Sequence, residues 1–441
     1  MSDVERVKKK GGVKRFFITV VVILMLFVNE DMLIFGTIAN PVISSVRLIS
    51  QLVIYSGIVI VFLLRKKEII INWDSEKLII VLCCLFGCMF LNRDIRFGYF
   101  FLALIFLTAY CICRLVSIDY IFEVYYKVIS FLCVISLCFF FLNVIGFKLI
   151  EKLPVITNVS GNRFYSVFFC NIPTTFDGFY RNWGPYREPG IFQMYVIISL
   201  VYGLFKKRDR NWFNLLVHIV TVVTTFSTTG YIALFFVIIA LIFDNNKENL
   251  VAKMTIILSS VCVICYLAIG TDLLYKDGYG SVFGKIFGSY SSPSLNARLS
   301  SVIVNFRIFI MNPLFGKGIT FVEDNYPIIA QSILGYTVVD NTNSICIIMS
   351  MFGIVPITLF AASYCFFVKK YFRLNVITSI FILTAIVCLM IGEKLTYIIL
   401  LYLFIFNKKS DILKEGTPAV KKKAAVCREE ERCKKELLRS I

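Results

Sequence analysis

The run at residues 97–116 is FGYFFLALIFLTAYCICRLV. It carries one charged side chain, Arg114, and about 20 apolar residues in a helix are enough to cross the hydrocarbon core of a bilayer. Comparable runs recur along the chain, in which 58% of the 441 residues are hydrophobic and only 17% are charged. A soluble protein of this length needs a more polar surface, so the composition excludes a cytosolic enzyme or a nucleic-acid-binding protein. The sequence therefore predicts an all-α polytopic membrane protein.

The apolar runs predict about twelve transmembrane helices in a single integral membrane domain over residues 1–441. The first run is interrupted by Asn29, Glu30 and Asp31, and the third run is short. The predicted spans are 16–38, 43–64, 77–91, 97–116, 127–149, 189–205, 212–227, 229–243, 254–271, 343–367, 374–391 and 394–406.

Basic side chains set the predicted orientation. The 46 Lys and Arg side chains outnumber the 28 Asp and Glu side chains, which gives a net charge of +18. Most basic clusters, such as residues 8–10, 65–67 and 206–210, fall on one side if the chain begins in the cytoplasm. Because basic loops of membrane proteins stay in the cytoplasm, both termini are predicted to be cytoplasmic, including the basic tail at 407–441. The positive charge thus requires no nucleic-acid partner.

This topology places two long loops outside the membrane, at about residues 150–188 and 272–342. Long loops in a compact bundle usually form a lid or a binding surface, so function is expected there. No matched pair of broken helices recurs in the two halves of the chain, which disfavours a secondary transporter. The 15 cysteines lie mainly in apolar runs without metal-ligand spacing, so disulfides are not expected.

The first outer loop combines cations with aromatic rings. These residues are Arg163, Tyr180, Arg181, Trp183, Tyr186 and Arg187. Arginine forks bind phosphate oxygens in pairs, and aromatic faces stack on sugar rings, so the mixture suits a lipid-linked glycan. An aromatic belt at the membrane interface, with arginines facing lipid headgroups, is the alternative.

The segment 187–190, Arg-Glu-Pro-Gly, places a charge pair at a helix start. Pro189 suits the first position of a helix, so Arg187 and Glu188 are expected at its amino terminus. The unpaired backbone donors and the positive dipole end there favour an anion. Glu188 is a candidate cap, a candidate ion-pair partner of an arginine, and a candidate general base.

The second outer loop offers a further cation and a polar patch. Helical spacing from Arg298 to Ile310 predicts an amphipathic helix that ends before Pro313, and the Gly-Lys-Gly turn at 316–318 is more often a loop than a phosphate cradle. Asp340, Asn341 and Asn343 precede the next apolar run and suit either capping or ligand contact. Asp340 is the second candidate base.

Two other features carry simpler predictions. His218 is the only histidine, lies in an apolar run without another ionisable residue, and is expected to make an interhelical hydrogen bond. Glu323 and Asp324 are adjacent but lack a third partner, so they are interpreted as a solvated turn rather than a metal site.

The order of these motifs resembles the superfamily of O-antigen polymerases (Wzy-type) and O-antigen ligases. The resemblance covers about residues 160–360: an Arg-Glu-Pro-Gly motif in a large outer loop, Ser-Thr-Thr-Gly at 227–230 between two tight spans, and a second large loop with Arg298 and Pro-Leu-Phe-Gly-Lys-Gly at 313–318. Flanking spans match in number and hydropathy. Arg187 and Arg298 match the arginines of the two loop motifs, and Arg163 and Arg181 lie in the first loop.

The resemblance implies a GT-C-like glycosyltransferase that needs no metal and no cofactor. Its substrate would be undecaprenyl-diphosphate-linked oligosaccharide at the outer face of the bacterial cytoplasmic (inner) membrane, with a chain-length regulator and a flippase as candidate partners. The four arginines named above would bind the diphosphate, and Glu188 or Asp340 would act as the base. The residues expected to contact sugar are Trp183, Tyr186, Tyr180, Asn341 and Asn343.

Two departures from the family pattern refine this expectation. The ligase branch usually has a histidine near an asparagine in the second loop, whereas this chain has Asp340-Asn341-Thr342-Asn343 there. Many relatives place Ser-Arg where Ser227-Thr228 stands, so one expected cation is absent. The first departure favours a polymerase of repeat units for O-antigen, a component of lipopolysaccharide, or for capsule. The alternatives are an O-antigen ligase and a flippase or transporter of lipid-linked oligosaccharide.

Overall fold

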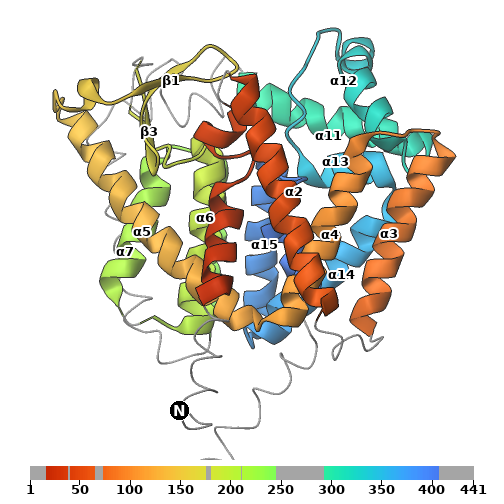
Figure 1. The fold of residues 1–441 in the computed structure, drawn as a ribbon, viewed down its shortest axis with the longest axis horizontal. Helices are drawn as coiled ribbons and strands as arrows, with labels where there is room; N and C mark the ends of the chain where they lie inside the picture. The colour runs from red at the N-terminus through yellow and green to blue at the C-terminus, as the bar shows by residue number, and fades with distance from the viewer. Residues whose placement is uncertain are drawn as a thin grey trace, which may run out of the picture.

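The computed structural model describes residues 16–37, 40–64, 73–174, 180–209, 211–244 and 293–406, and it is mostly helical (Figure 1). The predicted span at 254–271 and the tail at 407–441 lie outside these residues. The first helices are Phe16–Phe27, η1 (Leu33–Thr37), α2 (Pro41–Leu64), α3 (Trp73–Leu91), α4 (Phe97–Leu115), α5 (Ile118–Val144) and η3 (Ile150–Lys152). Next come α6 (Pro189–Val201), η4 (Tyr202–Lys207), α7 (Trp212–Thr224) and α8 (Thr228–Phe243). The last are α11 (Pro293–Met311), α12 (Gly318–Leu334), α13 (Ser344–Phe352), α14 (Ile354–Tyr371), α15 (Val376–Gly392) and α16 (Ile399–Phe406).

Several of these helices suit a bilayer. Five are long and apolar enough to cross a membrane: α2, α4, α5, α14 and the continuous segment Pro189–Lys207, which joins α6 to η4. Four shorter helices are also apolar, namely Phe16–Phe27, α7, α8 and α15. The chain is therefore a helical membrane protein, whereas the count of about twelve spans and the GT-C arrangement remain predictions.

The predicted span at 16–38 is helical to Phe27 and is divided from η1 at the polar residues noted above. Two other predicted spans are broken within largely apolar sequence. The run at 343–367 is not one helix, because Gly353 takes a φ of +81° between α13 and α14. A Cβ on Gly353 would lie 2.1 Å from the carbonyl oxygen of Leu314, so the backbone packs there against the preceding loop. The run at 394–406 is helical only from Ile399. Hydropathy does not reveal either break, since both runs stay largely apolar.

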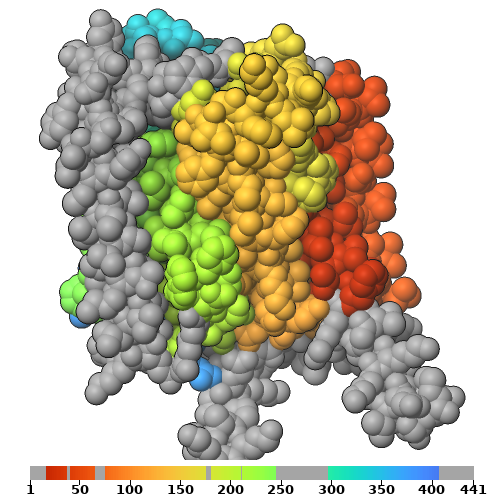
Figure 2. Space-filling model, turned by 90° about the vertical axis from the view of Figure 1, so that its left-hand side faces the viewer, coloured from red at the N-terminus to blue at the C-terminus, as the bar shows by residue number. Residues whose placement is uncertain are grey.

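The first outer loop contains a small sheet, which the sequence did not predict, beside the helical bundle. Strands β1 (Val155–Thr157), β2 (Arg163–Val167) and β3 (Cys170–Pro173) pair antiparallel in sequence order. Side chains of β2 alternate between exposed and buried positions, as expected for a strand covered on one face. Cys170 and Ile172 pack over Ile150. Figure 2 shows the sheet seated above α5, between the amino-terminal helix and α7.

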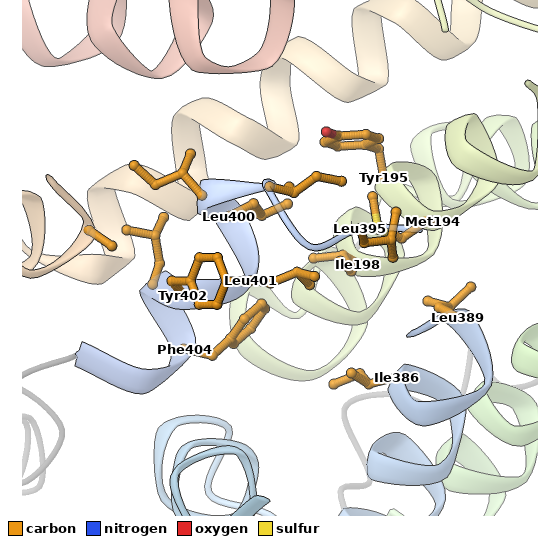
Figure 3. Close-up of a cluster of buried hydrophobic side chains, with 14 of the residues drawn as sticks. Met194, Tyr195, Ile198, Ile386, Leu389, Leu395, Leu400, Leu401, Tyr402 and Phe404 are labelled. Atoms are coloured by element: carbon orange, nitrogen blue, oxygen red, sulfur yellow. The ribbon is translucent and has the colours of Figure 1, made fainter. Parts of the chain in front are cut away.

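Helix α6 forms the centre of the bundle. Every residue from Pro189 to Val201 is buried, and a helix that is apolar on all sides belongs in such a core. Met194, Tyr195 and Ile198 of this helix lie near Leu389 of α15 and Leu401 of α16 (Figure 3). The polar residues just before Pro189 therefore stand at the end of a rigidly packed element.

The described charges gather at two ends of the bundle. At one end, called here the sheet end, lie β1–β3, α11, α12 and the start of α6 (Figure 1). At the other, the basic end, Lys206 lies 3.3 Å from Asp119 at the start of α5 and contacts Tyr371 at the end of α14. The described parts of both predicted outer loops thus share one end. Which end faces the cytoplasm remains a prediction.

The predicted amphipathic helix at 298–310 is present within α11, and its apolar side points outward. Leu299, Phe306 and Ile310 are 55%, 51% and 49% exposed, whereas Ser301 and Asn305 are fully buried. A helix that hides hydroxyl and amide groups and presents aliphatic ones suits apolar surroundings such as lipid.

Candidate functional site

A cavity of about 590 Å³ lies at the sheet end, between the start of α6, α11, α12, α13 and the segment after α15. Its charged and amide side chains are Arg187, Glu188, Arg298, Glu323, Asp340, Asn341, Glu393 and Lys394. The structure thus brings five of the residues predicted from the sequence to one cavity, although they come from two loops more than 100 positions apart. Glu393 and Lys394 were not predicted: Glu393 falls between the predicted spans 374–391 and 394–406, and Lys394 was counted within the second.

Arg187 and Glu188 stand at the start of α6 as expected. Glu188 is the N-cap residue with extended backbone (φ −146°, ψ 145°), and Pro189 opens the helix. The Glu188 side chain makes no capping hydrogen bond; it is 51% exposed, and Oε1 lies 3.7 Å from Nη1 of Arg187. Of the three roles considered for Glu188, the ion pair is therefore present and the cap is not.

Asp31 anchors Arg187 from the opposite side. Its carbonyl oxygen accepts a hydrogen bond from the Arg187 backbone N–H at 2.7 Å, and its Oδ1 accepts one from Arg187 Nε at 3.3 Å. Asn29 holds this turn, because its Oδ1 accepts the N–H of Asp31 at 2.9 Å. The Asp31 side chain is fully buried, and burial raises its pKa to about 7 against the opposing charge of Arg187. The polar interruption of the first apolar run is thus part of the site.

Arg298 and Glu393 face each other across the cavity. Nη2 of Arg298 lies 3.9 Å from Oε1 of Glu393, and the Arg298 side chain is 24% exposed. Glu393 is 6% exposed. Its pKa is raised to about 8, first by burial and then by the charge of Glu188, while Arg298 and Arg187 oppose the shift. A buried carboxyl with this pKa is a proton-exchanging group near neutral pH.

Close backbone packing fixes the position of Glu393. A Cβ on Gly190, the last residue of the Arg-Glu-Pro-Gly segment, would lie 2.0 Å from Glu393 Oε1. A Cβ on Gly392 would lie 2.6 Å from Cγ2 of Thr229, in the Ser-Thr-Thr-Gly segment. Ser344 Oγ donates to the Glu393 carbonyl and accepts the N–H of Leu395. The two short motifs noted in the sequence therefore meet at this carboxyl.

The polar patch before α13 is largely paired within the protein. Asn341 lines the cavity, and its Oδ1 accepts a hydrogen bond from Asn305 Nδ2 at 2.7 Å. Asn343 is buried and caps α13, because its Oδ1 accepts the N–H of Cys346 at 3.0 Å. Asp340 is exposed and lines the cavity. Of the three, Asn341 and Asp340 are in a position to meet a ligand.

Several predicted contacts lie away from the cavity. Arg181 donates to the carbonyl oxygens of Thr225 and Phe226, so it supports the turn before residues 227–230. Arg163 is exposed on β2. Neither lines the cavity.

The predicted aromatic platform is also not formed. Tyr186 is fully buried and stacks on Tyr195 with ring centroids 4.4 Å apart, so its faces are occupied by protein. Trp183 packs against Phe164, and Tyr180 is half-buried outside the cavity lining. The loop leads directly into the buried helix α6, so the rings of Trp183 and Tyr186 pack against protein. The aromatic side chain that lines the cavity is Tyr326.

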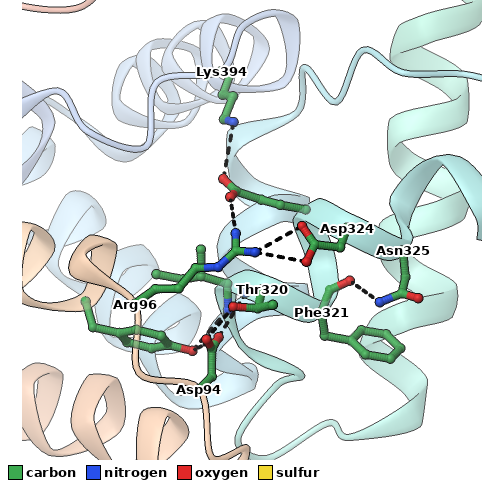
Figure 4. A network of polar contacts seen from close by, with 10 residues as sticks. Asp94, Arg96, Thr320, Phe321, Asp324, Asn325 and Lys394 are labelled. Atoms are coloured by element: carbon green, nitrogen blue, oxygen red, sulfur yellow. Dashed lines mark hydrogen bonds and ion pairs between the residues drawn. The ribbon is translucent and has the colours of Figure 1, made fainter.

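A second polar network borders the cavity (Figure 4). Arg96 pairs with Glu323 at 3.1 Å and Asp324 at 2.9 Å, and Lys394 lies 3.8 Å from Glu323. Asp94 accepts hydrogen bonds from Tyr99 and from Thr320. The interpretation of Glu323 and Asp324 as a solvated turn is wrong, because both lie on α12 and tie it to the α3–α4 connection. Among the described residues, no group of three or more Asp, Glu, His or Cys side chains is arranged to hold a metal ion.

The prediction for His218 is confirmed. Its Nε2 lies 2.9 Å from Ser199 Oγ on α6, and its Nδ1 donates to the carbonyl oxygen of Asn214. The ring also stacks on Tyr126. All its polar atoms are used within the bundle, so His218 is a packing residue.

No protein-family model matches this sequence, and a comparison with curated proteins gives no match either.

Proposed function

We propose that this protein is a membrane glycosyltransferase that polymerises undecaprenyl-diphosphate-linked oligosaccharide repeats into a surface polysaccharide. The observation that carries the proposal is the cavity at the sheet end, which pairs Arg187 from the first loop with Arg298 from the second. Two guanidinium groups that line one cavity suit a diphosphate, because each binds phosphate oxygens in a fixed fork. The start of α6 adds backbone donors and the positive end of a helix dipole.

The size of the cavity also favours this substrate class. About 590 Å³ lies within the usual range of roughly 300–1,000 Å³ for small-molecule sites and is enough for a diphosphate with an attached sugar ring. A lipid tail would leave the cavity toward the bilayer, and the apolar outward face of α11 lies beside it. The amide of Asn341 supplies a polar contact for sugar.

In the proposed reaction a hydroxyl of the acceptor sugar attacks the anomeric carbon of the donor glycan. The bond from that carbon to the diphosphate oxygen breaks, and its electron pair leaves with the diphosphate. Arg187 and Arg298 stabilise the developing negative charge, as preorganised cations do in other group transfers. The contacts of these cations with the cavity glutamates are long in the free protein, 3.7 Å from Arg187 to Glu188 and 3.9 Å from Arg298 to Glu393. Asp31 engages Arg187 through Nε, so Nη1 of Arg187 and the guanidinium of Arg298 face the cavity glutamates without a short ion pair.

A transporter of the same lipid is less well supported. Such a protein needs polar groups along a path through the bundle. Here the central helix α6 is buried along its length and carries no charged side chain, and the cavity charges are confined to one end.

Deleting the gene and analysing the surface glycan by electrophoresis tests the function. A polymerase mutant leaves single repeats where long chains stood. A ligase mutant accumulates long glycan on its lipid carrier, and a flippase mutant traps single repeats at the inner face. In vitro, the purified chain with a synthetic lipid-diphosphate repeat should give a ladder of elongated products. Absence of any ladder together with either alternative accumulation in cells would refute the proposal.

A further inference from the structure

The cavity contains four carboxylates, and one of them differs from the rest. Glu188, Glu323 and Asp340 are exposed to solvent to a substantial degree, with side-chain exposures of 51% and 35% for the two glutamates. Glu393 has a side chain that is 8% exposed, yet it still lines the cavity. A buried carboxyl that opens on a ligand cavity is placed to exchange a proton with whatever occupies that cavity.

The surroundings of Glu393 are built to receive this side chain. Gly190 leaves the space that Oε1 occupies, since a Cβ there would lie 2.0 Å from it. Gly392 packs on Thr229, and Ser344 bonds to the backbone on both sides of Lys394. Elements α6, α8, α13 and α15 thus all constrain one carboxyl. A residue that served only as a surface counter-ion would not need such a setting.

We propose that Glu393 is the catalytic proton acceptor of the transfer, a role that rests on the proposed function. The carboxylate takes the proton from the attacking hydroxyl while the oxygen lone pair forms the new glycosidic bond. The bond from the anomeric carbon to the diphosphate oxygen breaks, and its electron pair stays on that oxygen. Arg187 and Arg298 stabilise the resulting negative charge. The protonated Glu393 then releases its proton to water in the cavity. This assignment differs from the sequence-based candidates, Glu188 and Asp340.

The charged groups around Glu393 predict the pH dependence of the reaction. Glu188 at the start of α6 and Asp31 raise the pKa of Glu393, while Arg298 on α11 and Arg187 lower it, and Arg181 and Lys394 lie nearby. With a pKa of about 8, the carboxylate is the minor form at neutral pH. Because the carboxylate is the active form, kcat/KM should rise with pH and level off above about 8.

Glu393→Gln keeps the shape of the side chain and removes its basicity. In the purified full-length protein we expect kcat for a synthetic lipid-diphosphate repeat to fall by about 10²- to 10⁴-fold, the range for loss of a general base. Binding of undecaprenyl diphosphate alone should change much less, because the arginines remain. The residual activity should lose the rise toward pH 8. Glu151→Gln, an exposed glutamate outside the cavity, is the matched control and should keep the wild-type profile.

Two further variants separate the possible outcomes. Glu393→Asp should retain activity, with the midpoint of its pH profile displaced from that of the wild type. This variant keeps the inference testable if Glu393→Gln does not fold. Glu188→Gln should lower the pH midpoint, because Glu188 raises the pKa of Glu393. A Glu393→Gln protein with wild-type kcat and pH profile overturns the inference while the polymerase function stands. The inference is also overturned if the rise of activity with pH is lost in Glu188→Gln and kept in Glu393→Gln. A wild-type protein that elongates no glycan overturns both proposals.

Discussion

Charged side chains are paired differently at the two ends of the Pro189–Lys207 segment. At the basic end, Lys207 lies 3.0 Å from Asp209, and Lys206 lies 3.3 Å from Asp119. A tyrosine hydroxyl also donates a hydrogen bond to each carboxylate: Tyr126 to Asp209 and Tyr371 to Asp119. At the sheet end, the shortest contacts of Arg298 and Arg187 to the cavity glutamates are 3.9 Å and 3.7 Å. The basic end is closed by direct ion pairs. At the sheet end Asp31 holds Arg187 through Nε at 3.3 Å, which leaves Nη1 of Arg187 and the guanidinium of Arg298 for an additional anion.

This difference separates charges that hold the fold from charges that can do chemistry. Paired charges at the basic end are satisfied without any ligand, so their loss should affect assembly and orientation. The long pairs at the sheet end gain most when an oxyanion enters between them. The experiments below test this division, beginning with the outcome expected to be most absolute.

The first prediction concerns which end faces outward. Val159, between β1 and β2, is 70% exposed at the sheet end, and Lys370 is exposed at the end of α14. Val159→Cys in a background without native cysteines should react with an impermeant thiol reagent in spheroplasts. Lys370→Cys should react only after permeabilisation. The reverse pattern would show that the cavity faces the cytoplasm, where a polymerase of exported repeats would not work.

The second prediction concerns the cavity arginines. Alanine at Arg187 or Arg298 removes a charge-assisted contact of about 1.5–3 kcal/mol, so the elongation rate should fall about ten- to a hundredfold or more. Lysine at either position keeps the charge but loses the planar fork, and it should give an intermediate rate. The measurement is the initial rate of ladder formation at equal protein levels.

The matched control for these variants is Lys127→Ala, which breaks an exposed ion pair with Glu123 on α5. Such pairs contribute about 0–1 kcal/mol, and the rate should stay close to that of the wild type. Full activity in both cavity alanine variants would mean that the two arginines do not bind the diphosphate.

The third prediction compares two glycines on the same segment. Alanine at Gly190 pushes against Glu393, whereas alanine at Gly203 would place its Cβ 2.7 Å from the ring of Tyr126. We expect Gly190→Ala to lower the rate about tenfold or more, because even a 1 Å displacement of a catalytic group is costly. Gly203→Ala should instead destabilise the fold by about 1–3 kcal/mol through overpacking, with the rate per folded molecule retained. Thermal unfolding and kcat, measured on both variants, would contradict this division if they changed together.

The class of protein and part of the cavity lining can be predicted from the sequence. Long apolar runs predict membrane helices directly. Arg187 stands out because it precedes a proline that suits a helix start, and Arg298 because it opens a segment with helical spacing. The packing of α11 was not predictable, since Leu299 and Phe306 at helical spacing show a stripe but not whether lipid or protein covers it. Tyr186 was misplaced for a related reason: an aromatic residue near a helix start suits either a ligand or the core.

Glu393 was missed although a signal was present. Gly392, Glu393 and Lys394 interrupt two apolar runs, and ionisable residues in such a place are a functional indication. Assigning Lys394 to the next span concealed the interruption. The pairing of Glu393 with Arg298, about 95 residues earlier, depends on how α11 and α15 approach each other in space, which local patterns do not encode.

The last prediction concerns stability against pH, where the two ends should again differ. Asp31 and Glu393 have folded-state pKa values of about 7 and 8, raised above their unfolded values of 3.8 and 4.5. Between about pH 4 and 8 the folded chain therefore binds more protons than the unfolded chain, and stability falls as pH rises, by at most about 1.4 kcal/mol per pH unit for each group. At the basic end, burial acts to raise the pKa of Asp209, but hydrogen bonds from Asn211, Lys207 and Tyr126 outweigh it and lower the pKa. Its contribution is present above its unfolded pKa and is lost only in stronger acid. The thermal midpoint in detergent should thus fall from pH 5 to pH 8. Asp31→Asn should make that fall shallower, and Asp209→Asn should leave it unchanged over this range, even if it lowers the midpoint at every pH. Equal slopes in the wild type and in Asp31→Asn would show that Asp31 is ionised throughout and that its pair with Arg187 is a permanent structural bridge.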